Sequence, residues 1–136
     1  MIRAMHALLY SEDPAATRAF FKDVLRLPFV SESDSDEPSD WLIFRSGPSE
    51  FGVHPATGPG GETWAPAGQQ QVSFICDDIA ATVADLGERG AQFAGDPQDM
   101  GFGVGVAMLV PGAADVLLYE PKHRVAHGLP DGPAST

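Results

Sequence analysis

The phrase D-P-A-A-T-R-A at residues 13–19 returns as D-I-A-A-T-V-A at residues 78–84, an offset of 65 residues (78 minus 13). Each copy opens on an aspartate, which is a preferred residue at the N-cap of a helix. A phrase that recurs in this way is typical of one supersecondary unit built twice. We therefore expect two similar units, with a functional site lying between them.

Outward from the first copy, the pattern predicts a strand before the helix and further strands after it. Pro14 suits the first helical position, where a missing N–H costs nothing, and Pro28 ends the helix. The acidic and serine-rich residues 31–40 predict a solvated loop or an irregular edge strand. The expected elements are a strand at residues 2–9, a helix at 14–25 and strands at 41–44 and 51–54.

The second copy predicts the same order of elements. Asp77 and Asp78 form the cap of the second helix, and Gly90 supplies its C-terminal stop. The expected elements are a strand at residues 71–76, a helix at 79–89 and strands at 92–93, 104–110 and 116–120. The chain is thus expected to divide into a first module at residues 1–55, a linker rich in Gly and Pro at 56–70, a second module at 71–123 and a mobile tail at 124–136.

Composition limits the classes of partner. The 136 residues suit one ordinary domain or two small modules sharing a sheet, and a hydrophobic content of 43% is enough for a real core. The formal net charge of −11 disfavours nucleic acid and anionic membrane surfaces, because both are bound through basic patches. No segment approaches the roughly 18 consecutive apolar residues of a membrane helix.

The single cysteine, Cys76, excludes an internal disulfide and makes a reducing compartment the simplest expectation. It lies in an apolar strand, where a buried small residue is the usual role. The chain begins a strand almost at once, which leaves no room for a signal peptide. We therefore expect a cytoplasmic protein.

Each unit of strand, helix and three strands exposes one apolar sheet face that it cannot bury alone. Pairing two units closes the sheet around a cavity and leaves the helices outside. The sequence therefore predicts an α+β fold, in which two βαβββ modules form a curved mixed sheet around a cavity.

Four stretches of the sequence carry a family resemblance. They are the run from His6 to Asp13, the helix end A-F-F-K-D-V-L at residues 19–25, C-D-D-I at 76–79 and L-Y-E-P at 118–121. The order of these stretches along the chain and their duplication in two halves resemble the vicinal oxygen chelate superfamily. That superfamily includes glyoxalase I, the bleomycin-resistance proteins and the extradiol dioxygenases. The resemblance spans about residues 3–123. It implies a ligand-binding half-barrel of paired βαβββ modules, often completed by dimerisation.

The resemblance also implies four metal-ligand slots. Two lie on the first strand of each module, seven residues before the capping aspartate, at His6 and Gln71 (13 minus 6, and 78 minus 71). The other two are usually glutamates on the last strands, and they fall here on Phe51 and Leu117. Neither of these side chains can bind a cation, whereas His and Gln can.

Two other candidate ligands, His54 and Glu120, lie three residues beyond the last-strand slots. Because side chains alternate along a strand, an odd shift points them away from the cavity. A bulge at Gly52 could reverse this in the first half. A catalytic metal site usually needs at least three protein ligands and an open position.

Two remaining patterns are expected to have no chemical role. The glycines at 101, 103 and 105 resemble a phosphate loop only superficially, because no lysine follows and the run leads into a strand. We expect a hairpin there. His123 and His127 lie in or near the predicted tail and are expected to be inert.

Three functional hypotheses follow. The preferred one is a glyoxalase- or bleomycin-resistance-like protein that binds a small organic molecule without a metal cofactor. The alternative is a lyase/isomerase or dioxygenase that uses Ni, Zn, Fe or Mn bound by His6, His54 and Glu120, or by ligands from a dimer partner. A metal-free enzyme using His6 as acid or base is a third possibility. The ligand-binding residues expected on the preferred hypothesis are His6, Phe51, Gln71, Leu117 and Tyr119.

The implied partners are a small-molecule ligand and a second copy of the chain. A half-open sheet favours self-association, so we expect a homodimer.

Overall fold

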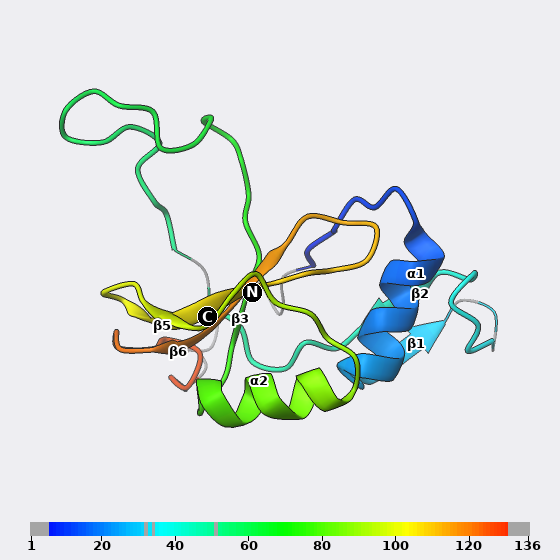
Figure 1. The fold of residues 1–136 in the computed structure, drawn as a ribbon. Coiled ribbons are helices and arrows are strands. Elements are labelled where there is room, and N and C mark those ends of the chain that lie inside the picture. Colours follow the sequence, from blue (N-terminus) through cyan, green and yellow to red (C-terminus); the bar gives the residue numbers. More distant parts are fainter. Residues whose placement is uncertain (1–5, 32, 34, 51, 131–136) are drawn as a thin grey trace.

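A computed structural model describes residues 6–31, 33, 35–50 and 52–130 of the chain. In chain order its elements are α1 (Pro14–Ala19), the π-helical segment η1 (Phe20–Val24), β1 (Phe29–Ser31), β2 (Leu42–Phe44), β3 (Ser73–Ile75), α2 (Ile79–Glu88), β4 (Gln98–Asp99), β5 (Gly103–Met108) and β6 (Val116–Pro121). The α+β class is confirmed (Figure 1).

The second half contains a strand, a helix and three strands in the predicted order, although one of the strands lies elsewhere than expected. Its four strands are ordered β3-β6-β5-β4, with β3 parallel to β6 and the other neighbours antiparallel. The helix α2 lies against one face of this sheet (Figure 1). The short strand expected at residues 92–93 is only an isolated bridge between Phe93 and Met108, and β4 forms later in the chain instead.

The first half has its helix and an antiparallel pair of strands, β1 and β2. The strand expected at residues 2–9 is absent from its described part, residues 6–9, and the strand expected at 51–54 is absent from 52–54. Both predictions are wrong for those residues, because neither segment finds a neighbouring strand to complete a ladder. Pro48 and Pro55 also remove backbone donors on either side of the second segment.

The repeated phrase forms the start of a helix in both halves, with the same hydrogen bonds. Asp13 accepts a hydrogen bond from the backbone N–H of Ala16 at 3.2 Å, and Asp78 accepts one from Ala81 at 3.0 Å. The threonine of each phrase then donates its hydroxyl to the carbonyl oxygen of its own capping aspartate. The Asp and Thr of the repeat are therefore helix-start residues.

The two helices also end alike. The second is followed by Gly90 with φ of 100°, and the first is followed by Arg26 with φ of 56°. Both are left-handed backbone conformations of the kind that closes a helix C-terminus. Pro28 was predicted to end the first helix, but the chain has already turned at Arg26.

The core of the second half follows the alternation of β6. Val116 and Leu118 are buried with Ile79 and Leu86 of α2, and Met108 of β5 is fully buried. Since neighbouring side chains in a strand point to opposite faces, residues 117 and 119 lie on the face turned away from α2.

The halves are joined where the loop after β5 meets the start of α1. The backbone N–H of Glu12 donates to the carbonyl of Gly112 at 2.8 Å, and the Ser11 hydroxyl contacts the same oxygen at 2.9 Å. The buried Thr17 hydroxyl also contacts the carbonyl oxygen of Pro111, so that its one proton is shared between this oxygen and the Asp13 carbonyl. The repeated threonine thus ties the first helix to the second half.

Residues 56–70, predicted to be a linker, form a loop that projects away from both sheets (Figure 1). Within the part of the chain that the structure describes, no helix is long and apolar enough to cross a membrane.

Candidate functional site

A cleft with a volume of about 1190 Å³ lies between the two halves. Its walls come from the N-terminal segment, α1, η1 and β2 on one side and from β3, β6 and the chain after β6 on the other. Among the residues that line it are His6, Leu8, Tyr10, Phe21, Trp41, Phe44, Glu50, Gln71, Phe74, Tyr119, His123 and His127. The location between the repeated units agrees with the expectation from the sequence.

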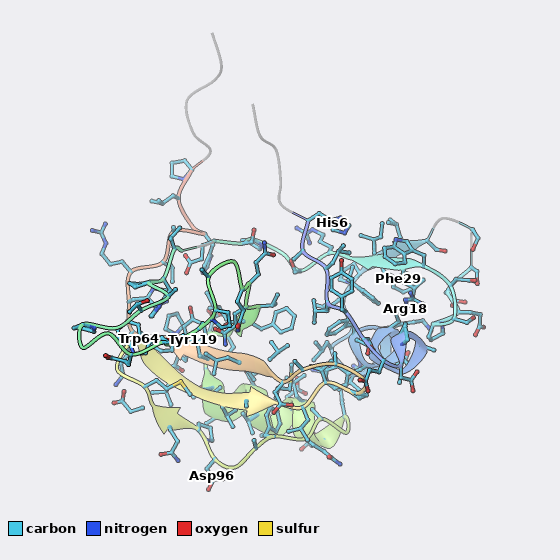
Figure 2. All side chains as sticks on the ribbon, turned by 90° about the horizontal axis from the view of Figure 1, so that it is seen from above. His6, Arg18, Phe29, Trp64, Asp96 and Tyr119 are labelled. Atoms are coloured by element: carbon cyan, nitrogen blue, oxygen red, sulfur yellow. The ribbon has the colours of Figure 1, made fainter. Side chains whose placement is uncertain are left out.

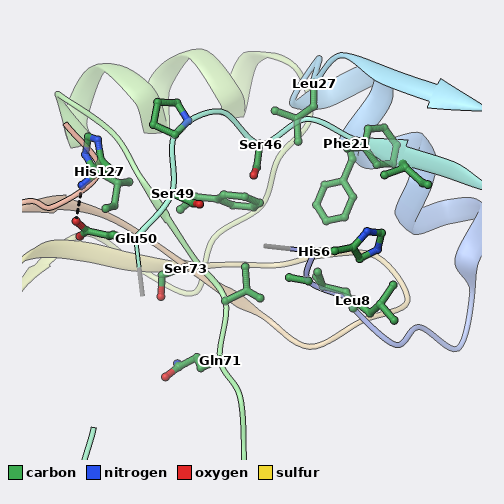
Figure 3. Close-up of a pocket in the computed structure, with 18 of the residues that line it drawn as sticks. His6, Leu8, Phe21, Leu27, Ser46, Ser49, Glu50, Gln71, Ser73 and His127 are labelled. Carbon is green, nitrogen blue, oxygen red and sulfur yellow. Dashed lines mark hydrogen bonds between the residues drawn. The ribbon is translucent and has the colours of Figure 1, made fainter. Parts of the chain in front are cut away.

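One end of the cleft is mainly apolar. Figure 3 shows Leu8 and Phe21 beside His6 at this end. The Phe21 ring packs edge-on against Phe44 of β2 and against Phe74 of β3, with ring centroids 5.6 and 6.3 Å apart. These rings join the two halves and give the cleft a rigid aromatic wall.

The other end is polar and is built around Glu50. Its Oε2 accepts hydrogen bonds from the backbone N–H groups of Ala126 and His127, one of which is drawn in Figure 3. The Ala126 N–H is the largest cause of a pKa for Glu50 below its ordinary value, and the nearby His123 and His127 also lower it. Residues 126 and 127 of the predicted tail therefore contribute to the wall of the cleft.

Tyr119 joins this polar end through a hydrogen bond to His123, with Oη and Nε2 at 2.9 Å. The Nε2 atom also lies 4.0 Å from Oε1 of Glu50. Burial raises the pKa of Tyr119 above its ordinary value, and the negative charge of Glu50 adds to that rise. The tyrosine therefore stays protonated and acts as a hydroxyl group.

The glycine run at residues 101–105 explains how Tyr119 is seated. A Cβ added at Gly105 would lie 2.8 Å from Cβ of Tyr119, and one added at Gly103 would lie 2.9 Å from its ring. These two glycines of β5 therefore leave room for the tyrosine of β6, and Phe102 packs edge-on against the same ring. The prediction of a hairpin approach is confirmed, and the run also supports a cleft residue.

The structure brings three of the predicted ligand-binding residues, His6, Gln71 and Tyr119, to the cleft. Leu117 is not in its lining, although it lies on the same strand face as Tyr119 and pairs with Ser73. Phe51 lies outside the described residues.

The alternative metal-ligand set is not assembled. Oε1 of Glu120 accepts a hydrogen bond from the backbone N–H of Ile79 at 3.1 Å, so this carboxylate serves the start of α2. His54 bonds to the Pro55 carbonyl and packs against Trp64, with ring centroids 5.3 Å apart. Across residues 6–31, 33, 35–50 and 52–130, no three His, Cys, Asp or Glu side chains lie where they could share a metal ion. The described donors thus do not fit a catalytic metal site.

Sequence reasoning did not single out Glu50, and it expected His123 and His127 to be inert, whereas all three residues line the cleft. Glu50 contacts residues 76 and 77 positions away, and no periodicity links the two segments. The only sequence feature that could have pointed to these residues is their position along the chain. Glu50 directly precedes the ligand slot at residue 51, and His123 follows the last strand by two residues.

The fold is shared with a solved structure of low sequence identity. A solved structure of a member of the glyoxalase/bleomycin resistance protein/dioxygenase superfamily from Sphaerobacter thermophilus aligns with a TM-score of 0.54 at 20% identity, covering 88% of this chain and 98% of that one. A lactoylglutathione lyase from Agrobacterium tumefaciens aligns with a TM-score of 0.49 at 20% identity, covering 87% and 92%.

A search of curated proteins found no match. The family model described as Glyoxalase/Bleomycin resistance protein/Dioxygenase superfamily matches residues 3–123, which is most of the chain. The match includes both copies of the repeated phrase and every helix and strand of the structure. The chain therefore belongs to the Glyoxalase/Bleomycin resistance protein/Dioxygenase superfamily.

Proposed function

We propose that this protein binds a small organic molecule in the cleft between its two halves and does so without a metal ion. The observation that carries the proposal is the cleft itself, with a volume of about 1190 Å³ and walls from both repeated units. Ligand pockets in proteins typically measure about 300–1,000 Å³, so there is space for a molecule of drug size.

The lining suits an organic ligand. Apolar and aromatic side chains such as Leu8, Phe21 and Phe74 supply the area that drives binding. His6 and Gln71 supply polar groups that can orient the ligand, as few and well-placed polar groups do in most pockets.

The metal-free character rests on residue types and on the contacts of one carboxylate. Leu117 occupies a position where the resemblance implies a metal-binding glutamate. Glu120, the acid three residues further on, is engaged at the start of α2 by a 3.1 Å hydrogen bond. A metal-dependent lyase/isomerase or dioxygenase would need a different arrangement of these strands.

Two features support a homodimer. The edge of β3 that faces away from β6 has no strand partner among the described residues, and residues 6–10 form no ladder either. Exposed strand edges are templates for pairing with another chain. We further propose the cytoplasm as the location, because the lone Cys76 suits a reducing compartment.

The test is a thermal-shift screen of a library of small organic molecules against the protein purified without chelator. A ligand that binds only the native state at about 100 times its Kd adds about 2.7 kcal/mol to the free energy of unfolding. We expect compounds that raise the melting temperature of the wild type. The rise should be smaller in Phe21→Ala, which changes the cleft wall, when each protein is compared with its own ligand-free melting temperature.

The control is a titration with Ni²⁺, Zn²⁺, Fe²⁺ and Mn²⁺. We expect no tight stoichiometric binding. Stoichiometric binding of one of these ions that is lost in His6→Ala would overturn the metal-free proposal in favour of the divalent-metal enzyme.

A further inference from the structure

We propose that Tyr119, His123 and Glu50 form a recognition site for a hydrogen-bond donor, best a protonated amine, on the ligand of the cleft. This inference rests on the proposed function, because it names the chemical group that the polar end of the same cleft accepts. All three side chains line the cleft.

The direction of the hydrogen bonds follows from the contacts of His123. Its Nδ1 lies 2.8 Å from the carbonyl oxygen of Arg124, which can only accept, so Nδ1 carries the proton of the neutral imidazole. The other nitrogen, Nε2, then has a lone pair and accepts the hydroxyl proton of Tyr119 at 2.9 Å. Oη of Tyr119 has therefore used its proton and presents its lone pairs.

Glu50 adds a second acceptor. Its Oε2 is occupied by the backbone N–H groups of Ala126 and His127, and both bonds favour the charged carboxylate. Its Oε1 lies 4.0 Å from Nε2 of His123, too far for a hydrogen bond, and accepts none from the described residues. Only 18% of the Glu50 side chain is exposed, so a ligand group reaching it would meet a partly dehydrated anion.

The site is held in place before any ligand arrives. Gly103 and Gly105 leave room for the Tyr119 ring, and Phe102 packs edge-on against it with ring centroids 5.4 Å apart. The two backbone donors fix the Glu50 carboxylate. Groups already held in their binding geometry lose little entropy when they bind, which favours recognition.

The two acceptors, Oη of Tyr119 and Oε1 of Glu50, and the negative charge of Glu50 disfavour anionic ligand groups and favour hydrogen-bond donors. A carboxylate on the ligand would meet the charge of Glu50 and the lone pairs of Tyr119. An ammonium could donate to either acceptor, and charge-assisted hydrogen bonds are roughly twice as strong as neutral ones. Arg124 also lines the cleft, but this residue is exposed, so water and salt screen its charge.

The test uses three probes with one aromatic ring and different head groups: benzylamine, benzyl alcohol and benzoate. Binding to the full chain is followed by NMR at about pH 8, where benzylamine is still an ammonium. We expect benzylamine to bind roughly tenfold more tightly than benzyl alcohol, as a charge-assisted hydrogen bond implies, and to shift the signals of Tyr119 and His123. Benzoate should leave those signals unchanged.

Three variants test which side chains cause the preference for the amine over the alcohol. Glu50→Gln should remove the preference for the amine over the alcohol, and Tyr119→Phe should weaken both several-fold. Asp96→Asn is the control, because it also removes one negative charge but lies at the lower edge of the molecule in Figure 2 and does not line the cleft. Its preference for the amine should stay within twofold of the wild-type value. If Glu50→Gln fails to fold, the Tyr119→Phe variant and the order of affinity of the three probes still test the donor site.

The outcomes separate this inference from the proposed function. Equal binding of amine and alcohol inside the cleft, equal effects of Glu50→Gln and Asp96→Asn, or tighter binding of benzoate would each overturn the donor site and leave the cleft as a ligand site. If none of the probes or library compounds binds the cleft, the proposed function fails as well.

Discussion

At the scale of single residues, Gly105 shows how a glycine can serve a neighbouring side chain. A Cβ at this position would lie 2.8 Å from Cβ of Tyr119 and 2.9 Å from the Leu118 carbonyl oxygen. Both contacts are shorter than van der Waals packing allows, and one involves rigid backbone. The glycine therefore fixes how closely β5 and the Tyr119 side chain can approach.

We predict that Gly105→Ala lowers the free energy of unfolding by about 1–3 kcal/mol, the usual effect of overpacking. The matched control is Gly87→Ala in α2, where an added Cβ meets nothing within 4 Å. An alanine in a helix is favoured over glycine, so this change should raise stability by about 0.5–1 kcal/mol. Urea denaturation of both variants measures the difference, and equal effects would contradict the packing at Gly105.

Glu50 should couple stability to acid pH. Its pKa is lowered from the ordinary value of 4.5, chiefly by the Ala126 N–H, so the folded state favours the charged carboxylate. Such a contribution is present above pH 4.5 and is lost as the pH falls through the lowered folded value. The wild type should therefore be more stable than Glu50→Gln near neutral pH, and the gap should close in acid.

Thermal unfolding of both proteins between neutral pH and about pH 3 measures that gap. A gap that stays constant throughout this range would show that the Glu50 carboxylate gains nothing from its contacts with Ala126 and His127.

The candidate site was only partly predictable from its residues. His6 and Gln71 could be found because the family resemblance implies a ligand slot seven residues before each capping aspartate, and both line the cleft. Glu50 and His123 could not, because their meeting depends on how the chain after β6 folds back toward the segment before residue 51. Local sequence patterns carry no information on such a long-range contact.

At the scale of elements, the start of α2 is served by two carboxylates. Asp78 accepts from Ala81, and Glu120 of β6 accepts from Ile79 at 3.1 Å. The first N–H groups of a helix lack partners within it, and a negative charge near them is favourable. Glu120 therefore connects the last strand of the second half to its helix.

We predict that Glu120→Ala destabilises the protein by about 1 kcal/mol, as the loss of a helix cap does. Glu88→Ala, at the other end of the same helix, is the control and should have little effect, because that side chain is exposed. Chemical denaturation in the presence of EDTA makes the comparison. If Glu120 instead bound a metal ion, its removal would matter only when metal is present.

The second half was predicted more accurately than the first. An element of the expected type overlaps each of the ranges 71–76, 79–89, 104–110 and 116–120. Those strands pair with one another inside a single half. The segments at residues 6–9 and 52–54 have no partner strand, and an extended segment becomes a strand only when its backbone groups are paired.

At the scale of the whole molecule, the described residues expose several large apolar side chains. Tyr10 is exposed by 89% and Val53 by 95%. Surface of this kind favours association of copies.

We predict a particle of 28.8 kDa (twice 14.4 kDa) by light scattering at micromolar concentration. Dilution should lower the melting temperature, because the stability of a dimer depends on its concentration. A particle of 14.4 kDa whose melting temperature is independent of concentration would contradict the homodimer.

The central claim is that an organic molecule occupies the cleft between the two repeated halves. The most direct measurement is a crystal structure of the protein with the library compound that most raises its melting temperature. The account predicts that the compound lies among His6, Phe21, Gln71 and Tyr119, held by side chains alone. A compound bound elsewhere on the surface, or a metal ion held by His6 between protein and compound, would contradict it.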